Sequence, residues 1–180
     1  SDQHLPGRIG SLSIIDEEFD VDAFQFSYPE GEEITNWMKQ LAEMYSRSVT
    51  DEDLQLYLKH HGSLREFKDF CSNYKDISLR EYLKATIEEY LKLLRTRIRD
   101  LKVDESELKE VLEPLFKESA MKFPFEMKSL FLGLIEDNLI RRLDIECITF
   151  NSRISESAMR VYFGEHGDSE FLKEVINQLK

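Results

Sequence analysis

The sequence is poor in cysteine, proline and glycine, and it has no long apolar run. Its 180 residues include two cysteines, Cys71 and Cys147, which are far apart in the chain. This composition argues against a disulfide framework, and with no secretory signal or N-glycosylation sequon we expect free thiols in the cytoplasm. No stretch approaches the roughly 20 apolar residues that a membrane-spanning helix requires, so we expect no membrane partner.

Sequence motifs for nucleotide and metal binding are also missing. The chain contains no P-loop, no G-x-G-x-x-G and no G-x-S-x-G, so nucleotide-binding and hydrolase functions have no support. His60, His61, Cys71 and His166 match neither the C-x-x-C nor the H-E-x-x-H spacing of a zinc site. We therefore expect no metal and no cofactor, and we expect His60, His61 and Gly62 to form a polar helix end.

Acidic residues outnumber basic ones, and most of the excess lies near the start of the chain. The formal net charge is −12, and residues 1–33, with nine acidic residues and one basic residue, hold −8 of it. A negatively charged chain repels phosphate backbones, which argues against a nucleic-acid partner. We interpret residues 1–33 as an acidic segment in which Phe24, Phe26 and Tyr28 are candidate binding residues. Its alternating pattern fits either a strand or an extended peptide.

The strongest helical pattern in the chain covers residues 78–102. A Ser78–Glu81 capping box marks its start, because each side chain can satisfy the backbone N–H of the other residue. The apolar residues that follow are spaced for one helix face: Leu79, Tyr82, Leu83, Ile87, Tyr90, Leu91, Leu94, Ile98 and Leu101. We expect this helix to organise the packing of its neighbours.

The remaining patterns predict a mainly α fold with a minor β element. We expect a bundle of about seven or eight helices that forms one domain over residues 34–180. Pro114 predicts a kink or break in a helix that starts after Asp104, unless neighbouring packing compensates. Residues 143–150 alternate as a short strand that could pair with the N-terminal segment near 12–15 or 24–28. Other helices are expected over about 33–46, 50–60, 63–74, 124–142, 155–163 and 169–179.

A basic row lies along the central predicted helix. Lys92, Arg95, Arg99 and Lys102 are spaced three, four and three residues apart, so they share one helix face. The row is either a solvated surface or a docking site for an acidic protein partner. We hypothesise that residues 16–22, the nearest acidic cluster in the sequence, lie against it until a partner displaces them.

Two short motifs suggest other activities. Arg8 stands three residues before Ser11, a spacing that basophilic kinases favour, so Ser11 is a candidate phosphorylation site. Residues 160–166, from Arg160 to His166, resemble the R-x(4–6)-H signature of HEPN ribonucleases. That resemblance implies metal-independent RNA cleavage by Arg160 and His166 at a dimer cleft, although Val161 stands where the family often has a polar residue.

These observations favour a non-catalytic protein-interaction or regulatory module that uses a helix face or groove. The alternatives are the HEPN-like ribonuclease and a small-ligand sensor with an apolar pocket between helices. Aromatic residues near segment edges either seal the ends of the bundle or contribute to a contact surface; those in the body are Phe123, Phe125, Tyr162 and Phe163. The oligomeric state does not follow from the sequence.

Overall fold

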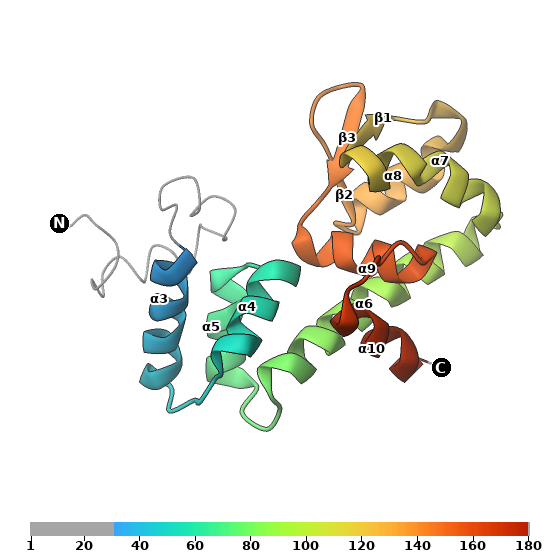
Figure 1. Cartoon of the computed structure of the whole chain (residues 1–180). Helices are drawn as coiled ribbons and strands as arrows, with labels where there is room; N and C mark the ends of the chain where they lie inside the picture. The colour runs from blue at the N-terminus through green and yellow to red at the C-terminus, as the bar shows by residue number, and fades with distance from the viewer. Residues whose placement is uncertain (1–30, 180) are drawn as a thin grey trace. The chain divides into compact units, whose positions relative to one another are not determined.

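The computed structural model describes residues 31–179, which are mainly helical (Figure 1). They contain eight α-helices and one small antiparallel sheet, so the predicted fold class is confirmed. The chain divides into two compact units, residues 1–83 and 84–180. The expectation of one domain over 34–180 stays a prediction, and the two units are described separately below.

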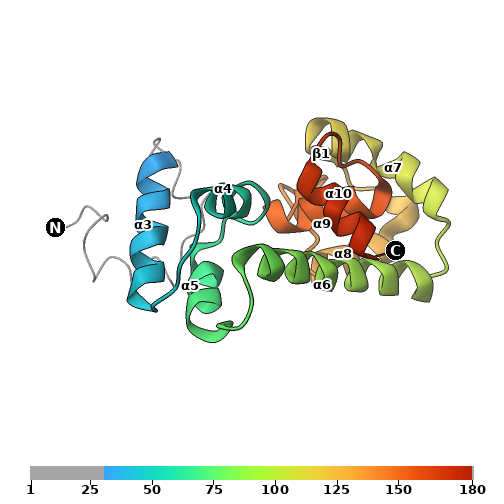
Figure 2. The same cartoon turned by 60° about the horizontal axis from the view of Figure 1, so that its bottom comes forward.

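Three helices dominate the described part of the first unit: α3 (Gly31–Met44), α4 (Asp51–His60) and α5 (Leu64–Asn73), which are grouped in Figure 2. Side chains cap the starts of α4 and α5, because the Thr50 hydroxyl accepts from the Asp53 N–H and the Ser63 hydroxyl accepts from the Glu66 N–H. Aromatic rings fill the space between the helices, with Phe70 contacting both Phe67 and Tyr82.

Arg47 lies in the loop between α3 and α4 and connects this loop to the residues that follow α5. Its guanidinium donates to the carbonyl oxygens of Tyr74 at 2.6 Å and Ile77 at 2.8 Å, and it lies 4.2 Å from the centre of the Phe70 ring. One cation thus satisfies carbonyl groups beyond the end of α5, where helical hydrogen bonds are lacking.

The predicted central helix is α6 (Leu79–Asp100), which begins in the first unit and continues into the second. The Ser78–Glu81 capping box forms, with Glu81 N–H donating to Ser78 Oγ at 3.1 Å and Ser78 N–H donating to Glu81 Oε1 at 3.4 Å. The predicted apolar face is buried from Leu79 to Ile98 apart from the half-buried Tyr90. Leu101 was wrongly assigned to this face: α6 ends at Asp100, and Leu101 is 42% exposed.

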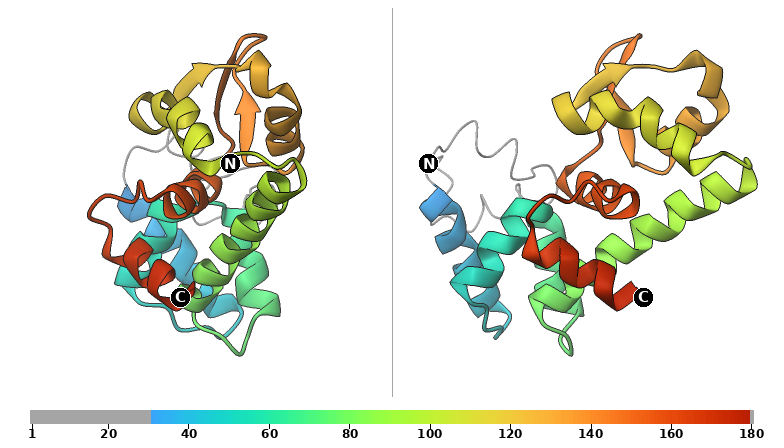
Figure 3. Two further views of the ribbon diagram at one scale, coloured as in Figure 1. Left: turned by 90° about the vertical axis from the view of Figure 1, so that its right-hand side faces the viewer. Right: turned by 45° about the vertical axis from the view of Figure 1, so that its right-hand side comes forward.

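The second unit contains a three-stranded antiparallel sheet in the order β1-β3-β2 (Figure 3). Its strands are β1 (Ala120–Lys122), β2 (Ile140–Arg142) and β3 (Cys147–Phe150). The register pairs Met121 and Arg142 with Ile148, which lies in the middle strand. Both neighbours of β3 therefore come from the second unit. Residues 12–15 and 24–28, the partners considered from the sequence, lie outside the described residues.

The predicted strand over residues 143–150 was too long. Residues 143–146 form a bend, and Leu143 and Ile145 are 52% and 82% exposed. Asp144 causes the bend, because its Oδ1 accepts from the N–H groups of Glu146 and Cys147, both at 2.8 Å. An aspartate that bonds its own following backbone favours a turn over a ladder.

The helix predicted over residues 124–142 also ends earlier. It forms as the 3₁₀ turn η1 (Phe125–Met127) and α8 (Lys128–Glu136), and the chain then enters β2. Asn138 adopts a left-handed conformation (φ 61°), and the Leu139 N–H donates to the Leu134 carbonyl at 2.9 Å. This left-handed C-terminal turn ends α8 even though the apolar pattern continues.

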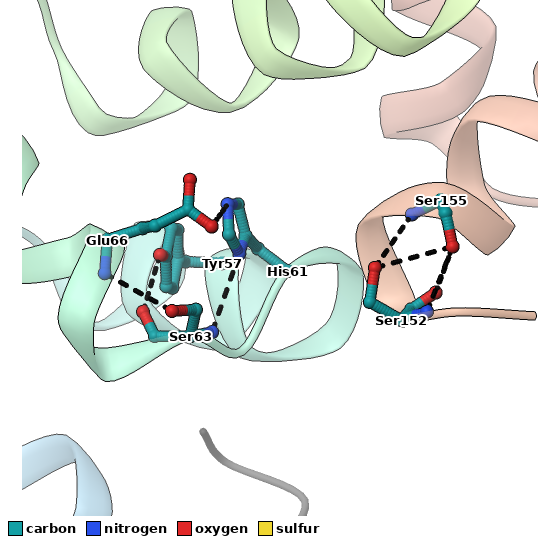
Figure 4. A network of polar contacts seen from close by, with 6 residues as sticks. All are labelled: Tyr57, His61, Ser63, Glu66, Ser152 and Ser155. Atoms are coloured by element: carbon teal, nitrogen blue, oxygen red, sulfur yellow. Dashed lines mark hydrogen bonds and ion pairs between the residues drawn. The ribbon is translucent and has the colours of Figure 1, made fainter. Parts of the chain in front are cut away.

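Three more helices complete the second unit: α7 (Glu105–Glu118), α9 (Arg153–Phe163) and α10 (Glu170–Leu179). α7 continues unbroken through Pro114, because Leu115 and Phe116 pack into the core and compensate for the lost hydrogen bond. Ser152 and Ser155 form the capping box that starts α9, drawn in Figure 4. α10 packs on α9, and Glu174 of α10 lies 3.6 Å from Lys84 of α6.

Candidate functional site

The basic row predicted from the sequence is exposed on α6 and at its C-terminal end. Lys92, Arg95, Arg99 and Lys102 are all exposed, and they lie away from the buried face of the helix. Arg99 pairs with the neighbouring Asp100, at 3.2 Å. Within residues 31–179, the other three form no ion pair. The row therefore presents exposed cationic side chains to the solvent.

Arg97, on the same helix, has a different role. Its Nε and Nη2 donate to the two carboxylate oxygens of Asp137 at 2.7 and 3.1 Å, and Nη2 lies 3.6 Å from Glu136. The hydrogen bond to Asp137 is the largest of the effects that raise the pKa of Arg97. Arg97 thus connects α6 to the C-terminal end of α8 and does not belong to the basic row.

A groove of about 670 Å³ lies where the basic row ends. One side comes from the turn between α6 and α7, and the other comes from η1 and the start of α8. We call it the corner groove; Lys102 belongs both to its lining and to the basic row. The lining residues are Leu101, Lys102, Val103, Asp104, Glu107, Phe125, Glu126, Met127, Lys128, Ser129 and Leu130.

Lys102 adopts an unusual backbone conformation at this position. Its φ is 53°, in the left-handed region that glycine prefers, and the Val103 N–H donates to the Ile98 carbonyl at 3.1 Å. Two hydrogen bonds define a Schellman motif, a common way to end a helix, and this one is the bond that spans more residues of the chain. A lysine in this conformation is strained relative to glycine. The left-handed turn places the exposed Lys102 side chain at the edge of the corner groove.

Phe125 forms the other apolar wall and is held in position by its neighbours. Its side chain is 67% exposed, and its ring lies 5.1 Å from the buried ring of Phe123. The Arg142 guanidinium lies 4.5 Å from the centre of the Phe123 ring and donates to the Ile145 carbonyl at 3.0 Å. The exposed aromatic ring therefore rests on ordered neighbours in the sheet region.

Charges around the corner groove are mixed but unevenly distributed. Lys102 and Lys128 are cationic, whereas Asp104, Glu107 and Glu126 are acidic. The Asp104 carboxylate already accepts from the N–H groups at the start of α7, at 2.8 Å from Ser106 and 3.3 Å from Glu107. Lys102 is the cation that the groove shares with the basic row.

Arg160, the arginine of the HEPN-like motif, holds three parts of the second unit together. Its Nε donates to Glu156 at 2.8 Å, Nη2 to the Phe116 carbonyl at 3.0 Å and Nη1 to the Glu165 carbonyl at 3.2 Å. His166 is half-buried, and its Nδ1 is enclosed without a hydrogen-bond partner among residues 31–179. Three donors of the guanidinium are therefore already occupied within the protein.

The His60–His61 corner is buried, contrary to the expected polar end, with both residues 5% exposed. The His61 ring stacks on Tyr57 at 4.7 Å, and its Nδ1 accepts from the Ser63 N–H at 3.4 Å (Figure 4). Burial is the largest cause that lowers the pKa of each histidine to about 4. Glu66 Oε2 lies 3.7 Å from His61 Nε2, but burial outweighs this attraction, and both rings are neutral at neutral pH.

The remaining sequence-predicted residues divide into three groups. Ser11, Phe24, Phe26 and Tyr28 lie outside the described residues. Phe123 and Phe163 are buried, and Tyr162 is half-buried and donates to Glu105 at 2.8 Å. Phe125 is the exposed member of that aromatic set. Leu101 and Lys128 were missed as groove residues, because neither carries a pattern that distinguishes it from an ordinary helical residue.

Neither the described residues nor comparison with known proteins identifies a further site. Residues 31–179 contain no group of three metal-ligating side chains and no helix that is long and apolar enough to cross a membrane. No family model, curated protein or solved structure matches this chain. The basic row and the corner groove are consequently the candidate site that the chain's own geometry provides.

Proposed function

We propose that this protein is a non-catalytic protein-interaction module that binds an acidic partner along the basic row of α6. The observation that carries the proposal is the exposure of Lys92, Arg95 and Lys102 without a carboxylate partner among residues 31–179. In a chain of net charge −12, a local row of exposed cations favours an acidic surface or peptide.

The acidic segment at residues 1–33 fits a regulatory part in the same proposal. It holds −8 of the net charge of −12, and residues 16–22 alone contain five acidic residues and no basic one. It would dock either on the basic row, where it competes with the partner, or on the partner itself. The free thiols of Cys71 and Cys147 are consistent with a cytoplasmic module.

Binding is better supported than the two alternatives. A HEPN-like ribonuclease requires Arg160 to contact RNA phosphate, but its guanidinium already donates to Glu156 and to two carbonyl groups. A small-ligand sensor requires an apolar pocket. The corner groove instead has two cationic and three acidic side chains in its lining.

The test is selection of a displayed random-peptide library on the full chain and on a charge-reversed variant. We expect the wild type to enrich acidic peptides and the Arg95→Glu/Arg99→Glu variant to lose that enrichment. The matched control is Arg65→Glu/Arg141→Glu, which changes the net charge equally at two exposed arginines outside the site.

The control should enrich the same peptides as the wild type. Raising the salt concentration should weaken the enrichment, because exposed charges are screened over about 10 Å at 0.1 M salt. Equal enrichment of acidic peptides by both double variants, or no acidic enrichment by the wild type, would exclude the proposal.

A further inference from the structure

The corner groove contains exposed apolar side chains, which binding to the basic row alone would not require. It combines two exposed apolar side chains, Leu101 at 42% and Phe125 at 67%, with the last cation of the row, Lys102. Surface apolar residues usually occur singly, and two that line one hollow indicate a contact site. The groove volume of about 670 Å³ accommodates a large side chain together with a short length of peptide backbone.

The Phe125 wall is restricted by contact with another ring, and the Leu101 wall by backbone hydrogen bonding at the end of α6. Phe125 is fixed against Phe123, which itself lies under Arg142. Leu101 follows the last residue of α6, directly before the left-handed turn at Lys102. A preformed groove with two exposed apolar side chains in its lining binds an anchor side chain with little loss of conformational entropy. Lys102 and the basic row beyond it then favour carboxylates that lie outside the groove, towards α6.

We propose that the corner groove receives one aromatic side chain from an acidic peptide segment of the partner, while the flanking carboxylates contact Lys102 and the basic row. This inference rests on the proposed function and adds the chemistry of the ligand: acidic residues around an aromatic anchor. The argument for this occupant is complementarity, since Leu101 and Phe125 both line the groove and Lys102, the last residue of the basic row, lies at its edge.

The probe is a fluorescein-labelled peptide of acidic residues with one central phenylalanine, compared with the same peptide carrying alanine at that position. Binding to the full chain is measured by fluorescence anisotropy. We expect the phenylalanine peptide to bind about tenfold more tightly, as burial of one aromatic side chain predicts. Because all variants carry the same residues 1–30, competition from that segment affects both peptides equally.

Phe125→Ser and Leu101→Ser should each bring the two peptides close to equal affinity. The matched control is Leu143→Ser, which removes an apolar side chain with 52% exposure outside the groove lining and should keep the tenfold preference. If the wild type does not prefer phenylalanine, or if Phe125→Ser leaves the preference unchanged, the groove assignment is overturned.

Lys102→Gly tests the contribution of the Lys102 side chain to peptide binding without destabilising the fold. Glycine relieves the left-handed strain at φ 53°, so the variant should be at least as thermally stable as the wild type while binding both peptides about threefold more weakly. Ser119→Gly, at φ 62°, provides the same backbone change outside the lining and should leave binding unchanged. Unchanged binding by Lys102→Gly would overturn the contact with Lys102.

The outcomes also distinguish the two proposals. If both peptides bind equally and Arg95→Glu/Arg99→Glu abolishes their binding, the basic row functions and the groove inference fails. If the wild type binds neither peptide, both fail.

Discussion

The side chain of Arg97 lies across the backbone of Gly133. A Cβ atom at position 133 would be 3.0 Å from both Cδ and Nε of Arg97, closer than side chains normally approach. The same Nε donates to Asp137 at 2.7 Å, so the arginine cannot move away without weakening that hydrogen bond. Gly133 thus leaves room for the Arg97 side chain that connects α6 to α8.

The contact between Arg97 and Gly133 predicts that Gly133→Ala lowers stability when the Arg97 side chain is present and raises it when that side chain is removed. Gly133→Ala should destabilise the wild type by about 1 kcal/mol, because the weakened charge-assisted hydrogen bond outweighs the helical preference of alanine over glycine. In an Arg97→Ala background, Gly133→Ala should stabilise the second unit by about 1 kcal/mol. Hydrogen exchange of the α8 amides measures both effects. The same sign in both backgrounds would show that Arg97 does not set the requirement for glycine.

The buried His60–His61 corner predicts loss of stability in acid. Both pKa values are lowered by burial from 6.5 to about 4, so the unfolded chain binds protons before the folded chain does. The contribution of neutral His61 is complete above about pH 6.5 and decreases as the pH falls towards about 4, by on the order of 3 kcal/mol. Trp37, which is buried in α3 and is the single tryptophan, reports this unfolding by fluorescence in urea.

His61→Phe separates the histidine from other acid effects. Phenylalanine can stack on Tyr57 but offers no acceptor to the Ser63 N–H, so the variant should be less stable than the wild type near neutral pH. The difference should shrink between about pH 6.5 and pH 4, because the variant has no histidine to protonate at this position. A difference that stays constant over this range would contradict the assignment of acid sensitivity to His61.

Arg160 is predicted to act in folding. Arg160→Lys should destabilise the second unit by about 3 kcal/mol, because lysine cannot donate simultaneously to Glu156 and to the carbonyls of Phe116 and Glu165. Hydrogen exchange of the α7 and α9 amides checks the loss. His166→Ala is the variant with which Arg160→Lys is compared. If the protein were a ribonuclease that used Arg160 and His166, each of the two substitutions would abolish RNA cleavage and leave the fold intact.

Asp144 is predicted to set the bend between β2 and β3. Asp144→Ala removes the acceptor for the Glu146 and Cys147 N–H groups, so these two amides should exchange faster with solvent. The same hydrogen bonds lower the pKa of Asp144, so protection in the wild type should be complete above about pH 4 and decrease as the pH falls through this lowered value. Asp144→Asn should show an intermediate effect. Equal exchange rates in all three proteins would exclude this role.

Local patterns in the sequence were sufficient for most of the helices. The buried face of α6 and the caps at Thr50, Ser63, Ser78 and Asp104 follow from residue spacing and from side chains that bond the nearest backbone groups. The errors occurred where a local turn interrupts a continuing apolar pattern. Asn138 ends α8, and Asp144 shortens the predicted strand, although apolar residues follow each of them, Leu139 and Ile145.

The amino-acid sequence by itself determined the mainly α fold and the part of the basic row that lies on α6, because side-chain periodicity within each segment encodes its helix and the exposed face of that helix. Only the tertiary structure decided that Arg97 and Arg160 are engaged within the second unit, that His60 and His61 are buried, and that Leu101 and Phe125 line one groove. These features depend on contacts between residues far apart in the chain, which spacing within a single helix does not encode.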